Sequence, residues 1–337
     1  MGIAGLVVGT ALIVMAVLDA LGTTVRVSTP GGLIVRWLGQ ALWMLVTAID
    51  QRLPRPVLRY VAGPLITLAV TSSWIGLVVV GWFLIFSSSE SALVTAPGQD
   101  PAGGWARLAY AMHAVFTLGS ASLQAATPLW EVLTGMAAGT GLFLVTLAIT
   151  YLMPLASAAS ERRRVARVLT ALGRRPCHII ASAWDGAGFS ALEHHLMTLT
   201  PQLAQLAEHH LTYPVLHYFQ TSDPEAAIAP AVARLDEALL LLHDAVRPPA
   251  RPAAIVTEPA REAITAFLAT IPERFTTAGD EVPPPPDLDE LRAAGVPCGP
   301  PEVLRAAADE HSGRRGQLGG LVRHSGWEWQ ASVDPAA

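Results

Sequence analysis

The chain has 337 residues, of which 52% are hydrophobic and only 15% charged, and its mean hydropathy is +0.42. A soluble domain carries about 25% charged residues, so this composition excludes a soluble monomer and a disordered chain. The formal net charge is −5 without a single lysine, so no basic stripe indicates nucleic acid as a partner. Cys177 and Cys298 lie too far apart for a disulfide scaffold or a metal-ligand pair, and we expect neither a metal nor a cofactor.

Three long stretches lack charge or nearly so, and each predicts a membrane-spanning helix. They are residues 2–25, which include Asp19, residues 60–89 and residues 132–160. A span needs about 20 apolar residues, a length that the second and third stretches exceed. The first stretch has neither a basic leading segment nor a small-residue cleavage site, so we interpret it as a span and not as a signal peptide.

Residues 32–51 have a different pattern. Arg36, Gln40, Thr47 and Gln51 fall on one face of a helix with a 3.6-residue period, and apolar residues cover most of the rest. A polar stripe of this kind predicts an interfacial helix on the inner leaflet. The alternative is an ordinary span that does not follow the distribution of charges.

A fourth uncharged stretch, residues 108–130, is rich in Thr, Ser, Gly and Gln in its second half. Arginines follow the first span within residues 26–59 and the third span within residues 162–175, and the positive-inside rule puts both groups in the cytoplasm. The spans at 60–89 and 132–160 cross the membrane out and back, so both arginine groups lie on the same side. A further crossing at 108–130 would place the arginines of residues 162–175 outside the cell. We therefore expect the N-terminus outside and residues 108–130 as a re-entrant loop that enters and leaves on the outer side.

The order of elements from 58 to 160 resembles the pore module of tetrameric potassium channels. A span is followed by a short amphipathic helix from about Trp105, a loop, and a long span that contains Gly141. Where that family has the filter Thr-Val-Gly-Tyr-Gly-Asp, this chain has Thr117, Leu118, Gly119, Ser120, Ala121 and Ser122. The resemblance implies a homotetramer, monovalent cations as the permeant species, residues 117–122 as the selectivity loop and Gly141 as the gating hinge.

Half of that filter signature is missing, and the loss has physical consequences. Filter carbonyls replace the hydration shell of the ion, and pointing them inward requires left-handed backbone at both glycines. An L-residue there costs roughly 1–2 kcal/mol, so Ala121 disfavours a standard filter. Either the loop relaxes into a wider, less selective path lined by Ser120, Ser122 and Gln124, or the channel fold does not conduct, or the chain is a membrane protein of another kind.

Three ionisable residues lie in or near the predicted membrane region. Asp19 is at the inner end of the first span, where we expect structural pairing with Arg26 or Arg36. His113 falls in the predicted pore helix and Glu131 just outside the third span. For both, a structural role stands beside a functional one, which is tuning of the loop for the histidine and attraction of cations for the glutamate.

The region after Glu161 is more polar and has no strand pattern, which predicts an all-α cytoplasmic domain. The third span should continue to Gly173. Start signals and apolar spacing then predict helices at 178–199, from Pro201, after Asp223, and near 260–271, 288–294 and 301–310.

The histidines are the one unusual feature of this region. The pairs His194–His195 and His209–His210, together with His217, favour polar helix faces over a metal site or a proton-sensing cluster, because adjacent residues point to different sides of a helix. No catalytic or nucleotide-binding motif is present in the sequence, so we do not expect an enzyme.

Together these patterns predict an all-α membrane protein with an N-terminal span, an interfacial helix, a span–pore loop–span module and a cytoplasmic α-helical domain. The predicted segments are 1–57, 58–160, 161–246 and 247–337, the last with Pro-rich linkers and short helices. We expect a multi-pass homotetramer in the lipid bilayer of the plasma membrane that conducts monovalent cations passively. The alternative is a non-conducting membrane scaffold or sensor that retains the channel fold.

Overall fold

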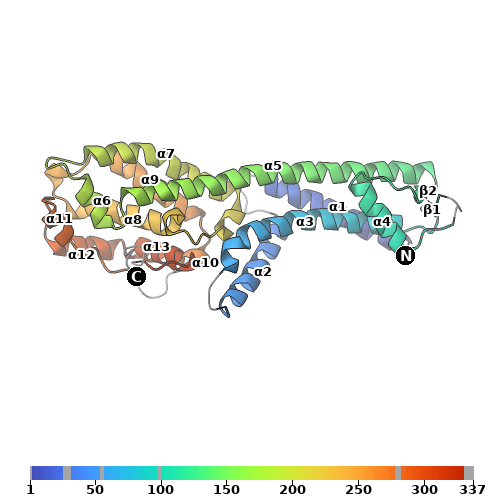
Figure 1. The fold of residues 1–337 in the computed structure, drawn as a ribbon, viewed down its shortest axis with the longest axis horizontal. Coiled ribbons are helices and arrows are strands. Elements are labelled where there is room, and N and C mark those ends of the chain that lie inside the picture. Colours follow the sequence, from blue (N-terminus) through green and yellow to red (C-terminus); the bar gives the residue numbers. More distant parts are fainter. Residues whose placement is uncertain (1, 26–31, 54–56, 97–99, 278–281, 330–337) are drawn as a thin grey trace. The chain divides into compact units, whose positions relative to one another are not determined.

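The computed structural model describes residues 2–25, 32–53, 57–96, 100–277 and 282–329. The chain forms two compact units, Met1–Ala156 and Ser157–Ala337, whose elements are labelled in Figure 1. The first unit combines the first predicted segment with most of the second, and the second unit combines the last two. Among the described helices, α1, α2, α3 and α5 are long and apolar enough to cross a membrane.

The first unit consists of helices and one small two-stranded sheet. Its elements are α1 (Gly2–Val25), α2 (Leu33–Asp50), α3 (Leu58–Phe86), β1 (Leu93–Thr95), α4 (Gly104–Val115), β2 (Leu123–Ala125) and the first part of α5 (Pro128–Leu172). The two strands are antiparallel. Helix α5 continues unbroken into the second unit and ends before Gly173, as its sequence predicts.

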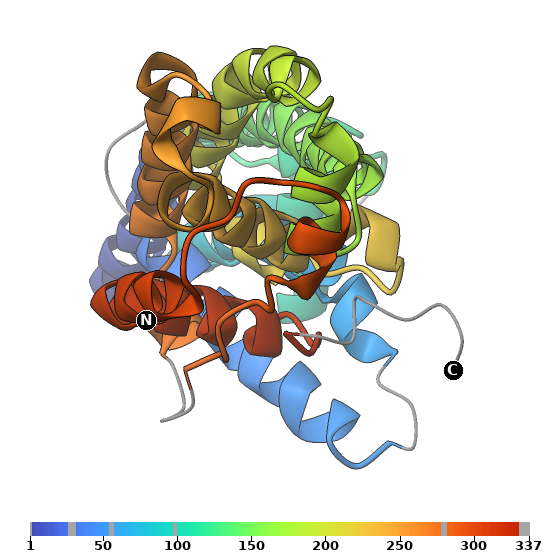
Figure 2. The same cartoon turned by 90° about the vertical axis from the view of Figure 1, so that its left-hand side faces the viewer.

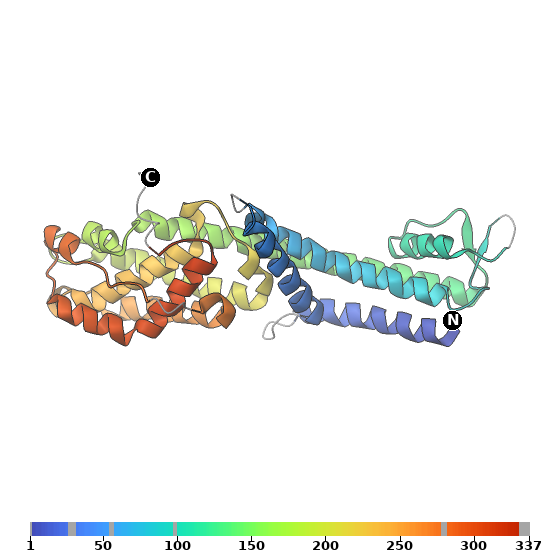
Figure 3. The ribbon, with the colours of Figure 1, turned by 90° about the horizontal axis from the view of Figure 1, so that it is seen from below.

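Helices α1 and α3 cross at a pair of glycines. A Cβ atom on Gly9 would lie 2.5 Å from the carbonyl oxygen of Gly81, and one on Gly81 would lie 2.8 Å from that of Gly9. Any side chain here would force the backbones apart, and small residues are what allow close helix packing in membranes. Figure 3 shows α1 and α3 running alongside each other, with α2 oblique to both.

The buried Asp19 connects the three helices α1, α2 and α3. Its carboxylate is 3.0 Å from the donating Trp74 Nε1 of α3 and 2.9 Å from the donating backbone N–H of Ile34 in α2. The predicted pairing with Arg36 is wrong, because Arg36 is exposed and forms no ion pair with Asp19 among the described residues. Arg26 lies outside the described residues, so its pairing stays a prediction. The first turn of a helix has free N–H groups, so Asp19 is satisfied by neutral donors.

The second unit is a bundle of helices around α8. Its elements after α5 are α6 (Pro176–Ala183), α7 (Ser190–Thr212), α8 (Ile228–Leu240), α9 (Ala254–Thr270), α10 (Glu273–Thr276), α11 (Asp289–Ala293), α12 (Pro301–Glu310) and α13 (Ser312–His324). Residues Leu241–Ala245 extend α8 as a π-helical turn. Figure 2 views this bundle from its end.

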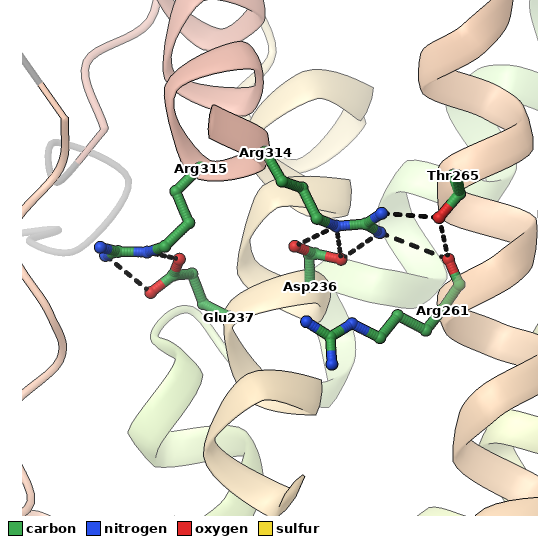
Figure 4. Close-up of polar contacts among 6 residues, drawn as sticks. All are labelled: Asp236, Glu237, Arg261, Thr265, Arg314 and Arg315. Carbon is green, nitrogen blue, oxygen red and sulfur yellow. Dashed lines mark hydrogen bonds and ion pairs between the residues drawn. The ribbon is translucent and has the colours of Figure 1, made fainter. Parts of the chain in front are cut away.

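Every residue of α8 is buried, so this helix is the core of the unit on all its faces and not only along the predicted apolar stripe. Its two acids, Asp236 and Glu237, are matched by consecutive arginines of α13 (Figure 4). The shortest distance is 2.6 Å both for Arg314 to Asp236 and for Arg315 to Glu237. Two adjacent buried charges are thus neutralised by two adjacent charges of opposite sign.

The predicted helix boundary at Pro201 is wrong, because α7 runs through it from Ser190 to Thr212. The break comes earlier, in the turn before α7, where Gly186 has φ +94°. The Asp185 carboxylate accepts the N–H groups of Ala187 and Gly188 at 2.8 and 2.7 Å and stabilises that turn. Pro201 lies inside α7, where it removes one backbone hydrogen bond without ending the helix.

Candidate functional site

The candidate site is the segment from Gly104 to Thr127, between the two long helices α3 and α5. It consists of α4, the loop of residues 116–122 and strand β2. It contains all six residues of the predicted selectivity loop.

One side chain holds the start of this segment at the end of α3. Arg107 is 8% exposed, and its guanidinium donates to the carbonyl oxygens of Phe86, Ser89, Glu90 and Ala102 at 2.9–3.2 Å. These acceptors include the last residue of α3, where the helix dipole favours a cation. The arginine therefore fixes the entry of α4 through carbonyl groups, and no carboxylate of the described residues pairs with it.

The end of the segment returns to the same place. Strand β2 pairs with β1 just after α3, with Leu93 opposite Ala125 and Thr95 opposite Leu123. Since α4 begins and β2 ends beside the C-terminal end of α3, the chain leaves this end of the unit along α4 and comes back through the loop.

The C-terminal end of α4, where the chain turns back, packs directly against α5 because Gly141 has no side chain. A Cβ atom there would lie 1.9 Å from the carbonyl oxygen of Val115, the last residue of α4. Gly141 thus allows α4 to touch α5, and α5 is an unbroken helix at this position. The structure gives this glycine a packing role, and its role as a gating hinge stays a prediction.

Aromatic and hydroxyl side chains complete the contacts between α4 and its neighbours. The hydroxyl groups of Tyr110 in α4 and Thr134 in α5 are 3.0 Å apart, and the Tyr110 ring meets Phe86 of α3 edge-on. Trp82 Nε1 of α3 donates to Thr140 Oγ1 of α5 at 2.9 Å. These contacts hold α3, α4 and α5 together and so fix the position at which the loop after α4 begins.

Helix α4 ends in a Schellman motif whose left-handed residue is Thr117. The Thr117 N–H donates to Ala114 O at 3.0 Å, and the Leu118 N–H donates to His113 O at 2.8 Å. Thr117 has φ +58°, at a position that is usually glycine. For a β-branched residue this backbone costs of order 1–3 kcal/mol, a strain typical of functional loops.

Beyond this cap the loop backbone has almost no partners. Among the described residues, no donor reaches the carbonyl oxygens of 117–121, and the N–H groups of 119–122 donate to no acceptor. Leu118 is 72% exposed, Ser120 is half-buried, and Thr117, Gly119, Ala121 and Ser122 are exposed. A row of five carbonyl groups therefore stands free for water, ions or another chain.

The two glycine positions of the resembled filter differ in their backbone. Gly119 has φ +73°, whereas the described non-glycine residues with positive φ do not include Ala121. The side chain of Ser120 accepts the Leu123 N–H at 3.3 Å, and Ser122 O accepts the Ala96 N–H at 3.0 Å. The loop thus has left-handed backbone at Gly119, the first filter glycine, but not at Ala121, which replaces the second. An alanine avoids this conformation because of its energetic cost.

The other two ionisable residues of this region are placed differently from each other. His113 lies in the last turn of α4, and its Nδ1 is buried without a hydrogen-bond partner in the described part of the chain. Glu131 is exposed in the first turn of α5. Sequence reasoning missed Arg107, although it is the only Asp, Glu, Lys or Arg between Asp100 and Glu131.

The histidines of the second unit divide into two groups. His194 and His195 are exposed on α7, whereas His210 is buried and stacks near His217, with ring centroids 5.2 Å apart. No cluster of three metal-binding side chains occurs among the residues that the structure describes.

No protein-family model matches the chain, and no solved structure matches it. A protein of Bacillus subtilis (strain 168) named "Uncharacterized membrane protein YdjJ" is 28% identical over 324 residues, which cover 96% of this chain and 94% of that protein. The similarity therefore extends over the apolar first unit and the polar second unit. Together with the four apolar helices, it supports a mostly helical membrane protein.

Proposed function

We propose that the chain forms a homotetrameric pore that conducts monovalent cations passively and with weak selectivity. The observation that carries this proposal is the row of free carbonyl groups at residues 117–121, on a loop fixed at both ends between two apolar helices. Backbone carbonyl groups are the usual ligands of a cation that has lost its water.

The depth of the loop supports a re-entrant path. Gly141, which touches the end of α4, is the fourteenth residue of α5, so the turning point lies about 20 Å along that helix. The hydrocarbon core of a bilayer is about 30 Å thick, so this point falls beyond the midplane when α5 spans the membrane. The arginines after Glu161 favour a cytoplasmic position for the second unit by the positive-inside rule.

The exposure of the loop supports assembly. One loop cannot enclose an axis, and Leu118 in a single chain has 72% of its surface uncovered. Cyclic symmetry with four copies would bring four such loops around one axis. In this arrangement Ser120 and Ser122 offer hydroxyl groups to a hydrated ion, and Ala121 avoids the strained backbone of a narrow filter.

A flux assay with one matched pair of glycine variants tests the proposal. Purified full-length protein in liposomes should release a potassium gradient, and Gly119→Ala should reduce the flux at least about tenfold, because left-handed alanine costs roughly 1–2 kcal/mol in each of four chains. Gly295→Ala is the control, since Gly295 has φ +78° and equally open space around its Cβ position, but lies outside the loop. Equal flux from both variants would contradict conduction through this loop.

The exposed Leu118 side chain favours the alternative of a non-conducting scaffold or sensor, because four leucines could close the axis. Absence of flux from correctly inserted tetramers would decide for this alternative. A stable monomer in mild detergent would count against both the tetramer and the pore.

A further inference from the structure

The second unit contains a partly open cavity of ≈ 50 Å³. One water molecule needs about 10–15 Å³, so the cavity has room for a small polyatomic ligand. Its described polar lining residues include Arg162, His210, His217, Gln220, Thr221, His324 and Ser325, and none of the described lining residues is an acid.

Arg162 brings a positive charge to this cavity. Its guanidinium donates to Leu216 O at 2.8 Å and to Phe219 O, and these carbonyl groups are neutral. Burial lowers the pKa of Arg162 to about 10, so the group still carries its charge at neutral pH. Unlike Arg314 and Arg315, which meet Asp236 and Glu237, this arginine faces no carboxylate in the cavity.

The N-terminus of α8 opens on the same cavity. Ala227, Ile228 and Ala229 line it and are 3%, 7% and 3% exposed, and no side chain caps the helix. Within the described chain, the N–H groups of Ile228 and Ala229 donate no hydrogen bond. A buried helix start without a cap needs a partner, and its dipole favours a negative one.

His210 provides an acceptor at the cavity wall. Its Nδ1 lies 2.8 Å from the carbonyl oxygen of Leu206, so this nitrogen must carry the proton. Burial, and then the charge of Arg162, lower the pKa of His210 to about 3, so the ring is neutral and Nε2 has a free lone pair. That nitrogen can accept a hydrogen bond from a hydroxyl group of a ligand.

We propose that this cavity binds a small oxyanion such as inorganic phosphate, held by the guanidinium of Arg162 and the free N–H groups at the start of α8. Helix N-termini and arginines both bind anions in proteins, and here both line one cavity with no acid among its described lining residues. A protonated oxygen of the anion would donate to His210 Nε2. The site is independent of ion conduction by the first unit.

Titration calorimetry on the full-length protein in mild detergent tests this proposal, with inorganic phosphate and sulfate as ligands and chloride at equal ionic strength as the control. We expect saturable binding of an oxyanion at one site per chain and none of chloride. Absence of saturable oxyanion binding to the folded wild-type protein would overturn the proposal, whatever the variants do.

Two variants locate the site. Arg162→Met removes the charge and should weaken binding about tenfold or more, as expected for a charge-assisted hydrogen bond. Arg163→Met, at the neighbouring exposed position, should bind like the wild type. Ser325→Leu fills the cavity with Arg162 intact and should abolish binding if the first variant does not fold. Unchanged binding in either folded cavity variant would show that the anion binds elsewhere.

Discussion

Replacing Arg315 by methionine should destabilise the second unit strongly, because it leaves Glu237 buried without its counterion. Arg315 Nε is 2.6 Å from Glu237 Oε1, Arg315 Nη2 is 3.2 Å from Oε2, and the two side chains are 3% and 2% exposed. Breaking a buried pair by removing one partner costs about 3–5 kcal/mol. The double variant Arg315→Met/Glu237→Leu should instead lie within about 1 kcal/mol of the wild type or above it, because no unpaired charge then remains buried at this position.

The stability of the Arg315→Met variant should depend on pH, because the carboxyl group of Glu237 is then buried without its counterion. Burial raises the pKa of Glu237, while the hydrogen bond and the charge of Arg315 lower it. Without Arg315 the pKa in the folded state rises further above its value in the unfolded chain. Stability is then lost as the pH rises through the folded-state pKa and is recovered as the pH falls. The difference between variant and wild type should therefore be larger at neutral pH than at about pH 5.

Denaturant unfolding of the full chain in mild detergent, followed by tryptophan fluorescence, measures these differences. Arg175→Met is the control, since its ion pair with Glu290 is 3.1 Å long but the side chains are 49% and 29% exposed. An exposed pair contributes at most about 1 kcal/mol. A loss for Arg315→Met no larger than for Arg175→Met would refute the reasoning.

Three further predictions concern the first unit and the membrane topology of the chain. Gly141→Ala should destabilise the first unit, because the new Cβ would lie 1.9 Å from Val115 O. Gly139→Ala, which has open space on the same helix, should be neutral or stabilising, and a comparison of thermal midpoints measures the difference. Thr117→Gly should raise the thermal midpoint by relieving about 1–2 kcal/mol of left-handed strain, and no gain would show that the strain is absent. Single cysteines at Ser89 and Ser325 should react with impermeant reagents from opposite sides of the membrane, and labelling from one side would contradict the re-entrant loop.

The long helices could be predicted because their sequence signal is local. Uncharged runs of span length gave α1, α3 and α5, and the end of α5 follows from Gly173. Whether α2 crosses the membrane or lies on it depends on the surrounding bilayer, and its length and composition fit both. Its interfacial position stays a prediction.

Features that depend on contacts distant in sequence could not be predicted. Helix α13 was missed because its glycines lower helix propensity, yet Gly320 lets the helix approach α10, where a Cβ atom would lie 2.5 Å from Thr276 O. Strands β1 and β2 are too short for a period-2 pattern. They pair only because α4 and the loop bring β2 back beside β1 at the end of α3.

The chemistry of the loop was only partly predictable. The residue types at 117–122 indicated a changed filter; the backbone is left-handed at Gly119 and not at Ala121, and the role of the loop as a filter stays a prediction. The Schellman motif at Thr117 was not foreseen, because threonine is an uncommon residue at that position. The partners of Asp19 and Arg107 are neutral backbone and indole groups, which leave no charge pattern in the sequence.

Planar-bilayer recording of the purified protein under bi-ionic conditions, with potassium on one side and sodium on the other, tests directly whether the loop conducts. We expect cation current with a reversal potential near zero, because a loop without left-handed backbone at Ala121 cannot form a narrow potassium filter. Strong potassium selectivity would contradict the argument from Ala121, and the absence of current from correctly inserted protein would contradict the pore itself.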